Sequence, residues 1–235
     1  MNNLDFLNVI SLSFKEFLES GTSRSNAKLK PLHGAIAQDI ASRLGEDYKV
    51  FSQGYGNDKE EKICGRYVDK MVDITVQDCK GKAVAGIAVK FVMQNYSQNS
   101  NNYFENMLGE TANIRSNKIP YFQVFIILDK LPYYKKDKTI QKWETFTDRN
   151  INKYINLSKD NTDLFFHTPN KTLIYVVHIP DNDNLGTRDE YRSYYKKIQP
   201  AVKLSTHIYR DFDSAVILND YETFINKVYH TILSA

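Results

Sequence analysis

Two charged residues stand inside otherwise apolar, strand-like stretches of the sequence. Asp73 interrupts residues 71–76 (MVDITV), and Lys90 interrupts residues 87–92 (IAVKFV). An unpaired buried charge is costly, so each needs a partner, a solvent face or a metal ion. An ion pair, or an edge-strand lysine that opposes sheet aggregation, would explain either residue alone. Together they favour a functional site, because a carboxylate can bind a metal ion beside which a lysine orients water.

The two stretches are joined by a polar segment that predicts a β-hairpin. With a turn centred between Lys80 and Gly81, residues whose numbers add to 161 face each other, so Asp73 lies opposite Ala88. The Cβ atoms of such a pair are roughly 4.5–5.5 Å apart. Lys90 projects to the same face two residues farther on, and a register slip of one residue would separate the groups.

This hairpin resembles the core of the PD-(D/E)XK nucleases, and among them the type II restriction endonucleases. That core has an aspartate on its first strand and an acidic-x-Lys tripeptide on its second. Asp73 and residues 88–90 (AVK) match these positions, with Val72 where a proline is usual. The polar stretch and helix at 97–110 fit the element that often follows. The resemblance covers roughly residues 31–128.

The resemblance implies a Mg²⁺-dependent endodeoxyribonuclease. A phosphodiester repels hydroxide, so its cleavage needs cations at the developing charge. Mg²⁺ prefers oxygen ligands, polarises the phosphate and lowers the pKa of a bound water. By the resemblance, Asp73 is a metal ligand and Lys90 is the partner of the attacking water.

Ala88 departs from the pattern, because a methyl group cannot bind a metal and Asp73 alone is a weak Mg²⁺ site. Three explanations stay open: a natural acid at position 88 has been replaced, the carboxylate comes from the following helix, or the protein only binds DNA. For the second explanation, Glu105 is the first candidate and Glu110 the second, each with a helix-surface role as the ordinary alternative. The expected catalytic set is therefore Asp73, Ala88, Lys90 and Glu105, with the metal held at Asp73 and at position 88 or Glu105.

A restriction endonuclease reads base edges, usually as a homodimer on palindromic double-stranded DNA. Asn and Gln can pair with adenine through two hydrogen bonds, so the polar stretch after the hairpin is a candidate reader, with a solvated loop as the ordinary alternative. Two lysines are candidate phosphate contacts. The predicted DNA-binding residues are Gln94, Asn95, Gln98, Asn99, Asn101, Asn102, Lys135 and Lys136.

A cognate DNA methyltransferase is the expected partner in the same system. Two rival functions remain open. One is a nuclease of the same fold in phage defence or repair. The other is a non-catalytic DNA-binding protein in which Asp73 and Lys90 form an ion pair, and that function predicts no metal dependence.

The composition suits one folded domain of 235 residues, with 42% hydrophobic and 25% charged residues. The net charge is only +3, so a nucleic-acid surface must come from local clusters. Tyrosines adjoin Lys or Arg at 133–136 and 191–197, which suits phosphate contacts, although an exposed loop and an amphipathic helix with solvated lysines are the ordinary alternatives. Two cysteines without CxxC spacing, scattered histidines and no signal peptide or membrane-spanning run predict a cytoplasmic protein without a zinc site.

Apolar periodicity predicts helices at 4–18, 32–44, 102–114, 145–157, 187–198 and 221–233. It predicts strands at 48–51, 71–76, 83–92, 121–128 and 172–179. A linker at 22–30 and loops at 54–65 and 94–101 separate them. This order predicts an α/β fold with a mixed central sheet flanked by helices, a core at about 31–180 and a C-terminal helical elaboration at 181–235.

Overall fold

The computed structural model describes residues 1–20 and 26–234, so the predicted linker at 22–30 falls partly outside the described residues. Its helices are α1 (Asn3–Glu19), the short 3₁₀ helix η1 (Asn26–Leu29), α2 (Lys30–Leu44), α3 (Tyr96–Arg115), α4 (Asp148–Ser158), α5 (Arg188–Ile198) and α6 (Tyr221–Leu233). Its strands are β1 (Tyr48–Ser52), β2 (Glu61–Ile63), β3 (Lys70–Val72), β4 (Ile74–Asp78), β5 (Ala83–Val92), β6 (Tyr121–Leu128), β7 (Lys130–Tyr134), β8 (Ile140–Thr145), β9 (Lys171–His178), β10 (Lys203–Leu204) and β11 (Val216–Leu218).

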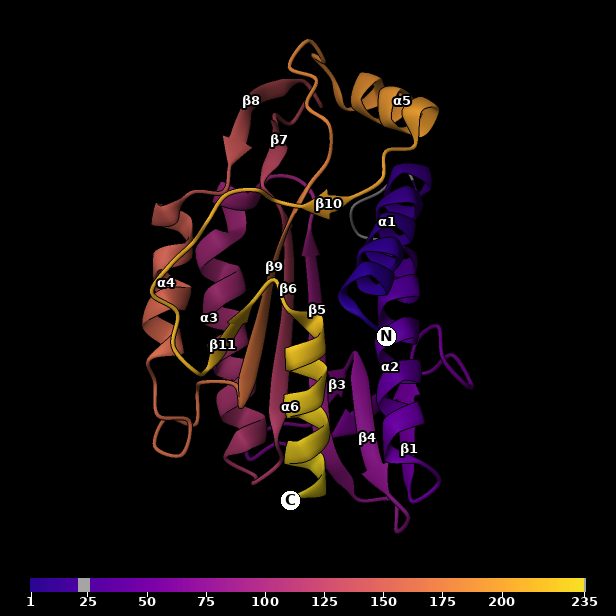
Figure 1. Cartoon of the computed structure of the whole chain (residues 1–235), viewed down its shortest axis with the longest axis vertical. Coiled ribbons are helices and arrows are strands. Elements are labelled where there is room, and N and C mark those ends of the chain that lie inside the picture. Colours follow the sequence, from indigo (N-terminus) through magenta and orange to yellow (C-terminus); the bar gives the residue numbers. More distant parts are fainter. Residues whose placement is uncertain (21–25, 235) are drawn as a thin grey trace.

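A mixed sheet of seven strands forms the centre of the fold, in the order β1-β4-β5-β6-β9-β10, with β11 also paired to β9 (Figure 1). The neighbours β5, β6, β9 and β11 are parallel, whereas β1 and β4 run antiparallel at one edge. Helices cover β6 and β9 on both faces, which is why both strands are almost continuously apolar. The predicted α/β class, with a mixed sheet between helices, is confirmed.

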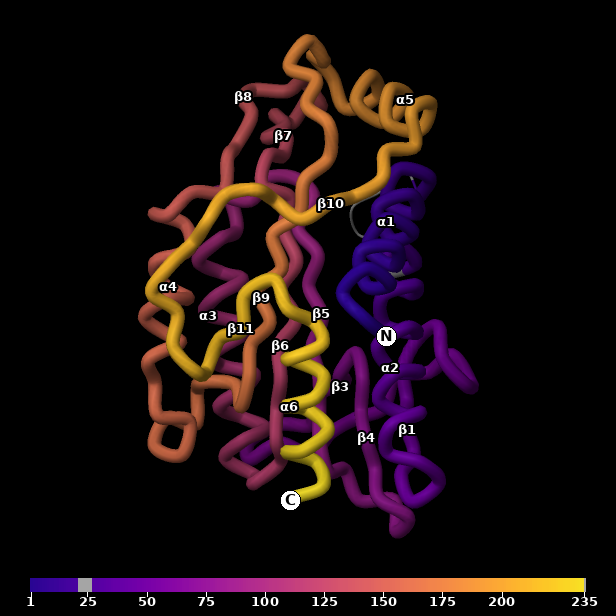
Figure 2. The backbone as a smooth tube through the Cα atoms, viewed as in Figure 1, coloured from indigo at the N-terminus to yellow at the C-terminus, as the bar shows by residue number. Residues whose placement is uncertain are grey.

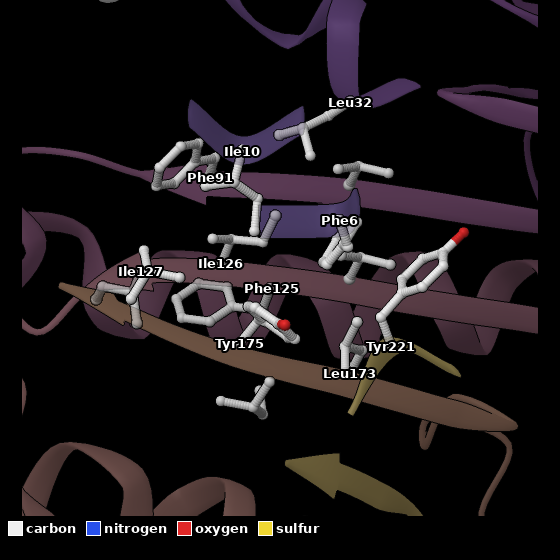
Figure 3. Close-up of a cluster of buried hydrophobic side chains, with 14 of the residues drawn as sticks. Phe6, Ile10, Leu32, Phe91, Phe125, Ile126, Ile127, Leu173, Tyr175 and Tyr221 are labelled. Atoms are coloured by element: carbon white, nitrogen blue, oxygen red, sulfur yellow. The ribbon is translucent and has the colours of Figure 1, made fainter. Parts of the chain in front are cut away.

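Helices pack on both faces of the sheet. On one face α1, α2 and α6 contact one another, and the Phe6 ring stacks on Tyr221 at 4.2 Å and meets Tyr175 edge-on at 5.0 Å (Figure 3). On the other face, Tyr154 of α4 packs against Phe125 of β6 with ring centroids 5.4 Å apart. Helices therefore bury most of both faces of the sheet.

The carboxyl ends of the parallel strands carry additional structure. β6 leads into the β7–β8 hairpin, and the chain after β9 leads into α5, which lies beside the end of α1 (Figures 1 and 2). The Arg188 N–H donates to the Lys138 carbonyl at 3.0 Å and so joins the hairpin to the start of α5. Within residues 1–20 and 26–234, no helix is both long and apolar enough to cross a membrane.

The predicted hairpin register is confirmed where β4 and β5 pair. Ile74 faces Ile87, a pair whose numbers add to 161, and the next two pairs follow the same rule. The ladder then shifts by one residue between Val76 and Gln77, where a β-bulge lies. The bulge is on the turn side, so it leaves the register at the Asp73 end unchanged.

Several predicted boundaries on the N-terminal side are wrong. The strand predicted at 71–76 is two strands, because the chain bends at Asp73 to leave the β2–β3 pair and join the main sheet. The loop predicted at 54–65 contains β2 for that same reason. The loop predicted at 94–101 is mostly helix, since α3 begins at Tyr96. The polar residues there reflect the exposed side of a helix rather than a loop.

The C-terminal part is also less helical than predicted. Residues 181–235 contain β10 and β11, which both pair with β9 and therefore belong to the central sheet. Strands of two and three residues are too short for an apolar period to appear in the sequence. The β7–β8 hairpin was likewise not predicted, because its strands mix polar and apolar residues without alternation.

Candidate metal centre at Asp73

Asp73 lies at the bend between β3 and β4, so it belongs to two hairpins at once. Asp73 itself is in neither ladder, but continuing the β4–β5 register by one residue places it opposite Ala88. In β2–β3, Glu61 pairs with Val72, and continuing that register by one residue places Glu60 opposite Asp73. Because opposed residues project to one face, Asp73 has a methyl group on one side and the Glu60 carboxylate on the other.

His33 approaches this pair from α2. The next residue, Gly34, packs against the backbone at Gly54, where an added Cβ would lie 2.3 Å from the carbonyl oxygen. Glycine is therefore required at this contact, which sets α2 directly against the loop that leads to Glu60. One ligand atom from each of His33, Glu60 and Asp73 lies within 4.8 Å of the other two.

The described residues give these three side chains few hydrogen bonds and little opposite charge. Only 2% of His33 is exposed, and neither ring nitrogen has a hydrogen-bond partner among the described residues. Burial lowers the pKa of His33 to about 4, so the ring is neutral near pH 7 and keeps a free lone pair. Burial, followed by the charge of Glu110, raises the pKa of Asp73 to about 6. Burial and then the charge of Asp73 raise the pKa of Glu60.

A divalent cation would compensate this cluster. The Val89 N–H donates to Asp73 Oδ2 at 2.7 Å and fixes the carboxylate, while Oδ1 accepts no hydrogen bond from the described part of the chain. Carboxylate oxygens suit Mg²⁺, and a neutral imidazole nitrogen is a better ligand for Mn²⁺, Fe²⁺ or Zn²⁺. The residues present therefore fit a divalent metal ion.

A cavity of about 390 Å³ opens beside Asp73, between β5 and α3, and we call it the metal-side cavity. Ala88 and Lys90 line it, as their shared face with Asp73 predicted. Lys90 is exposed, and its Nζ lies 4.5 Å from the centre of the Tyr103 ring. Partial desolvation lowers the pKa of Lys90, against the attraction of Asp73. Gln123, paired with Ala88 across β5–β6, adds an amide where the carboxylate is missing.

The two helix carboxylates are placed differently. Glu110 lines the metal-side cavity, forms an ion pair with Lys70 at 3.1 Å and accepts a hydrogen bond from the Tyr121 hydroxyl. Glu105 is exposed and does not line the cavity. Five helical residues rotate a side chain by about 140°, so the two point to different sides of α3. The structure therefore brings Glu110, and not Glu105, to the site.

A second cavity, of about 370 Å³, adjoins the first and is lined by Lys90 and Tyr103 as well. Four of the predicted DNA-binding residues line it: Gln94, Asn95, Gln98 and Asn99. The other four are exposed outside both cavities: Asn101 and Asn102 on α3, and Lys135 and Lys136 at the tip of the β7–β8 hairpin. Asn95 has a structural task, since its side chain hydrogen-bonds the backbone N–H and carbonyl of Tyr134.

Sequence reasoning missed His33 and Glu60. Spacing rules find ligands within one element, whereas these come from a helix, a loop and a bend. A usable signal exists for Glu60, because residues 61–63 and 70–72 mirror each other about a turn at Arg66 and Tyr67. His33 has no such signal, since a histidine on an apolar helix face usually belongs to the core.

Comparison with protein-family models, with curated proteins and with solved structures finds no match to this chain. The geometry and chemistry of the two cavities are therefore the evidence for what the chain does.

Proposed function

We propose that the chain is a metal-dependent endodeoxyribonuclease with its catalytic centre at Asp73 and Lys90. The observation that carries this proposal is the cluster of the buried His33 with the partly exposed Glu60 and Asp73, beside a cavity that Lys70 and Lys90 line. Phosphodiester cleavage requires a cation and hydrogen-bond donors, because negative charge develops on the phosphate oxygens. The resemblance of residues 73–90 to the PD-(D/E)XK core agrees with the proposal.

His33, Glu60 and Asp73 would hold the cation. When bound, a divalent ion polarises the phosphate and lowers the pKa of a coordinated water. The Val89 N–H keeps the Asp73 carboxylate oriented toward this position. Lys90 lines the same cavity, so its ammonium can donate hydrogen bonds to the attacking water or to the phosphate oxygens.

Glu60 supplies the carboxylate that position 88 lacks. Both residues are cross-strand neighbours of Asp73, one in each hairpin. Of the three explanations for Ala88, this arrangement favours a displaced carboxylate, but from the loop before β2 rather than from the following helix α3. We therefore expect the chain as written to be active.

Double-stranded DNA is the proposed substrate, and Mg²⁺ or Mn²⁺ the proposed cation. We further propose a type II restriction endonuclease that acts as a cytoplasmic homodimer beside a cognate DNA methyltransferase. The amides of Gln94, Gln98 and Asn99 close to Lys90 support this, because such amides can read adenine. Fragments of fixed size would separate a restriction enzyme from a same-fold nuclease in phage defence or repair.

Incubation of plasmid DNA with the chain and Mg²⁺ or Mn²⁺ tests the proposal. We expect cleavage that is lost with EDTA and in Asp73→Asn, which keeps the shape and the hydrogen-bond acceptor. Asp69→Asn is the matched control, because Asp69 is exposed and outside the metal-side cavity. Absence of metal-dependent cleavage by the folded wild-type chain on any DNA would contradict the proposal.

An Ala88→Glu variant separates the explanations for position 88. If Glu60 already completes the site, wild type cleaves and Ala88→Glu changes the rate only modestly. Cleavage that appears only in Ala88→Glu would show that a natural acid has been replaced, and it would contradict the role of Glu60. DNA binding without cleavage in both versions would favour a non-catalytic DNA-binding protein.

A further inference from the structure

The β2–β3 hairpin exposes large apolar side chains at and beside its turn, residues 64–69, which we call the hairpin tip. Tyr67 is 77% exposed, Val68 is 62% exposed, and Met71, just beyond the tip, is 51% exposed. Exposed apolar residues that occur singly are ordinary. Three of them within residues 67–71 form a patch instead, and such patches mark interaction sites.

Asn113 of α3, only 8% exposed, fixes the backbone of the hairpin tip. Its Oδ1 accepts hydrogen bonds from the N–H groups of Tyr67 at 2.9 Å and Val68 at 3.3 Å, and its Nδ2 donates to the Val68 carbonyl at 2.8 Å. The Asn113 carbonyl accepts from the Arg66 N–H at 2.8 Å. Gly65 is required here, because an added Cβ would lie 2.1 Å from Asn113 Nδ2. The tip is thus held in one conformation while its side chains stay exposed, which lowers the entropic cost of binding a partner.

The hairpin tip continues the wall of the metal-side cavity. Lys70 and Met71, the residues directly after the tip, line this cavity, and so does Glu110 of α3. Asn113 follows Glu110 by three residues, so both side chains lie on the same side of the helix. A substrate in the metal-side cavity that extends along this side of α3 therefore reaches the tip.

The charge around the hairpin tip suits a nucleic acid. Residues 62–71 contain three exposed cations, Lys62, Arg66 and Lys70, and one exposed acid, Asp69. The guanidinium carbon of Arg66 lies 5.8 Å from the centre of the Tyr67 ring. A cation beside an exposed aromatic ring can bind phosphate and base together. A stable protein dimer needs roughly 20–30 residues on each side, far more than the tip offers, so DNA is favoured over a second copy of the chain.

We propose that the hairpin tip contacts the DNA duplex that is cut at the metal centre. Tyr67 and Val68 pack against the bases, as exposed aromatic and apolar side chains do in DNA grooves, and Arg66 binds a phosphate through its guanidinium. Six residues separate Tyr67 from Asp73, so their Cα atoms are at most roughly 22 Å apart. The contact therefore lies within about six base-pair steps of the scissile phosphate. The proposal rests on the proposed nuclease function, but it can be tested without cleavage.

DNA binding in EDTA tests the hairpin tip apart from catalysis. The anisotropy of a fluorescein-labelled duplex of mixed sequence is measured over a range of salt concentrations. We expect Tyr67→Ala to weaken binding by about tenfold, the usual loss for one aromatic contact with a base, without changing the salt dependence. Arg66→Gln should instead lower the slope of log affinity against log salt by about 0.9, the value for one lost phosphate contact.

Each variant has a matched control away from the hairpin tip. Leu4→Ala removes a comparably exposed apolar side chain from α1, and Arg149→Gln removes an exposed guanidinium from α4. Both should bind like wild type, and Tyr67→Phe, which keeps the ring, should retain most of the affinity. Circular dichroism melts report whether each variant folds. Equal behaviour of the tip variants and their controls, or no duplex binding by wild type at any salt concentration, would overturn the DNA contact.

Sedimentation of the same variants distinguishes DNA from a second copy of the chain. If Tyr67→Ala dissociates an oligomer but binds the duplex as tightly as wild type, the tip is an interface between copies and the DNA contact is overturned. Cleavage separates this proposal from the proposed function. If the tip variants lose affinity as expected but no version cleaves DNA with Mg²⁺ or Mn²⁺, the DNA contact stands and the proposed catalysis fails.

Discussion

Two adjoining cavities share Lys90 and differ in their other charged lining residues. The metal-side cavity is lined by two carboxylates, Asp73 and Glu110, and by two lysines, Lys70 and Lys90. The second cavity has Lys28 and Lys90 and no acidic residue among its described lining. Groups that suit a metal ion therefore line the first cavity and not the second.

Lys90 lies where the two cavities meet. Asp73 raises the pKa of Lys90, but desolvation outweighs this attraction and the pKa of Lys90 is still lowered. In the metal-side cavity Lys70 already pairs with Glu110 at 3.1 Å, so Lys90 and Asp73 are the charges that the proposed substrate and cation would meet.

Lys90, at the boundary, gives the largest expected effect. Lys90→Ala should lower the cleavage rate by about 10²–10³-fold at saturating DNA and metal, the usual cost of losing a donor to developing charge. Single-turnover cleavage measures the rate. Lys82→Ala, at an exposed lysine directly before the same strand, is the control and should cleave normally. Similar rates for the two variants would show that Lys90 takes no part in the chemistry.

Glu60 should matter and Glu105 should not. Glu60→Gln removes a proposed ligand, so the metal concentration for half-maximal cleavage should rise by at least about 10–100-fold. Substitution of residues that only hydrogen-bond the metal ligands already lowers metal affinity by that factor. Glu105→Gln makes the same change on the exposed side of α3 and should leave metal dependence unchanged. If Glu105→Gln raised the metal requirement and Glu60→Gln did not, Glu105 of α3 would be the second metal ligand, as predicted from the sequence.

Substitution of His33 should change which divalent cation the proposed metal site prefers. A neutral imidazole nitrogen suits Mn²⁺ better than Mg²⁺, so wild type should need less Mn²⁺. His33→Gln should weaken this preference by about tenfold, while the exposed His230→Gln should not change it. Metal titrations of cleavage measure both. Equal Mn²⁺ preference in wild type and His33→Gln would remove His33 from the ligand set.

Sequence reasoning succeeded where contacts are local. The face shared by Asp73, Ala88 and Lys90 followed from one hairpin turn, and β6 followed from its continuous apolar run. The strands β10 and β11 could not be predicted, because two or three residues show no period and their pairing with β9 depends on the rest of the fold.

The functional clusters were predicted only in part, since their members come from distant segments. His33 reaches Asp73 because Gly34 lets α2 approach the loop backbone, a contact with no trace in residue spacing. Arg192 belongs to a stretch that predicts an amphipathic helix with solvated lysines. Lys196 and Lys197 on that helix are exposed as predicted, but Arg192 is buried and packs against Phe17 of α1. The residue types indicate which groups could bind a metal ion or a phosphate. Tertiary packing determines which of them are buried and which lie together.

The smallest expected effect is on stability, and it has a defined sign. Burial raises the folded pKa of Asp73 to about 6 from its ordinary 3.8. Between these values the folded state binds more protons than the unfolded state, so the contribution of Asp73 to stability falls as pH rises through this window. Above about pH 6 the cost of the buried charge is fully present. Asp73→Asn should therefore stabilise the metal-free protein near pH 7.5 by about 1–3 kcal/mol.

Urea unfolding in EDTA at several pH values measures this effect. The advantage of Asp73→Asn should shrink as pH falls through about 6 and vanish near pH 4, where the wild-type carboxyl is also neutral. The exposed Asp69→Asn should show no such pH dependence. An Asp73→Asn variant that is less stable near pH 7.5 would mean that the carboxylate is compensated by the protein alone. Asp73 would then be an ordinary ion-paired carboxylate, and the metal-side cavity would have no uncompensated negative charge for a metal ion to neutralise.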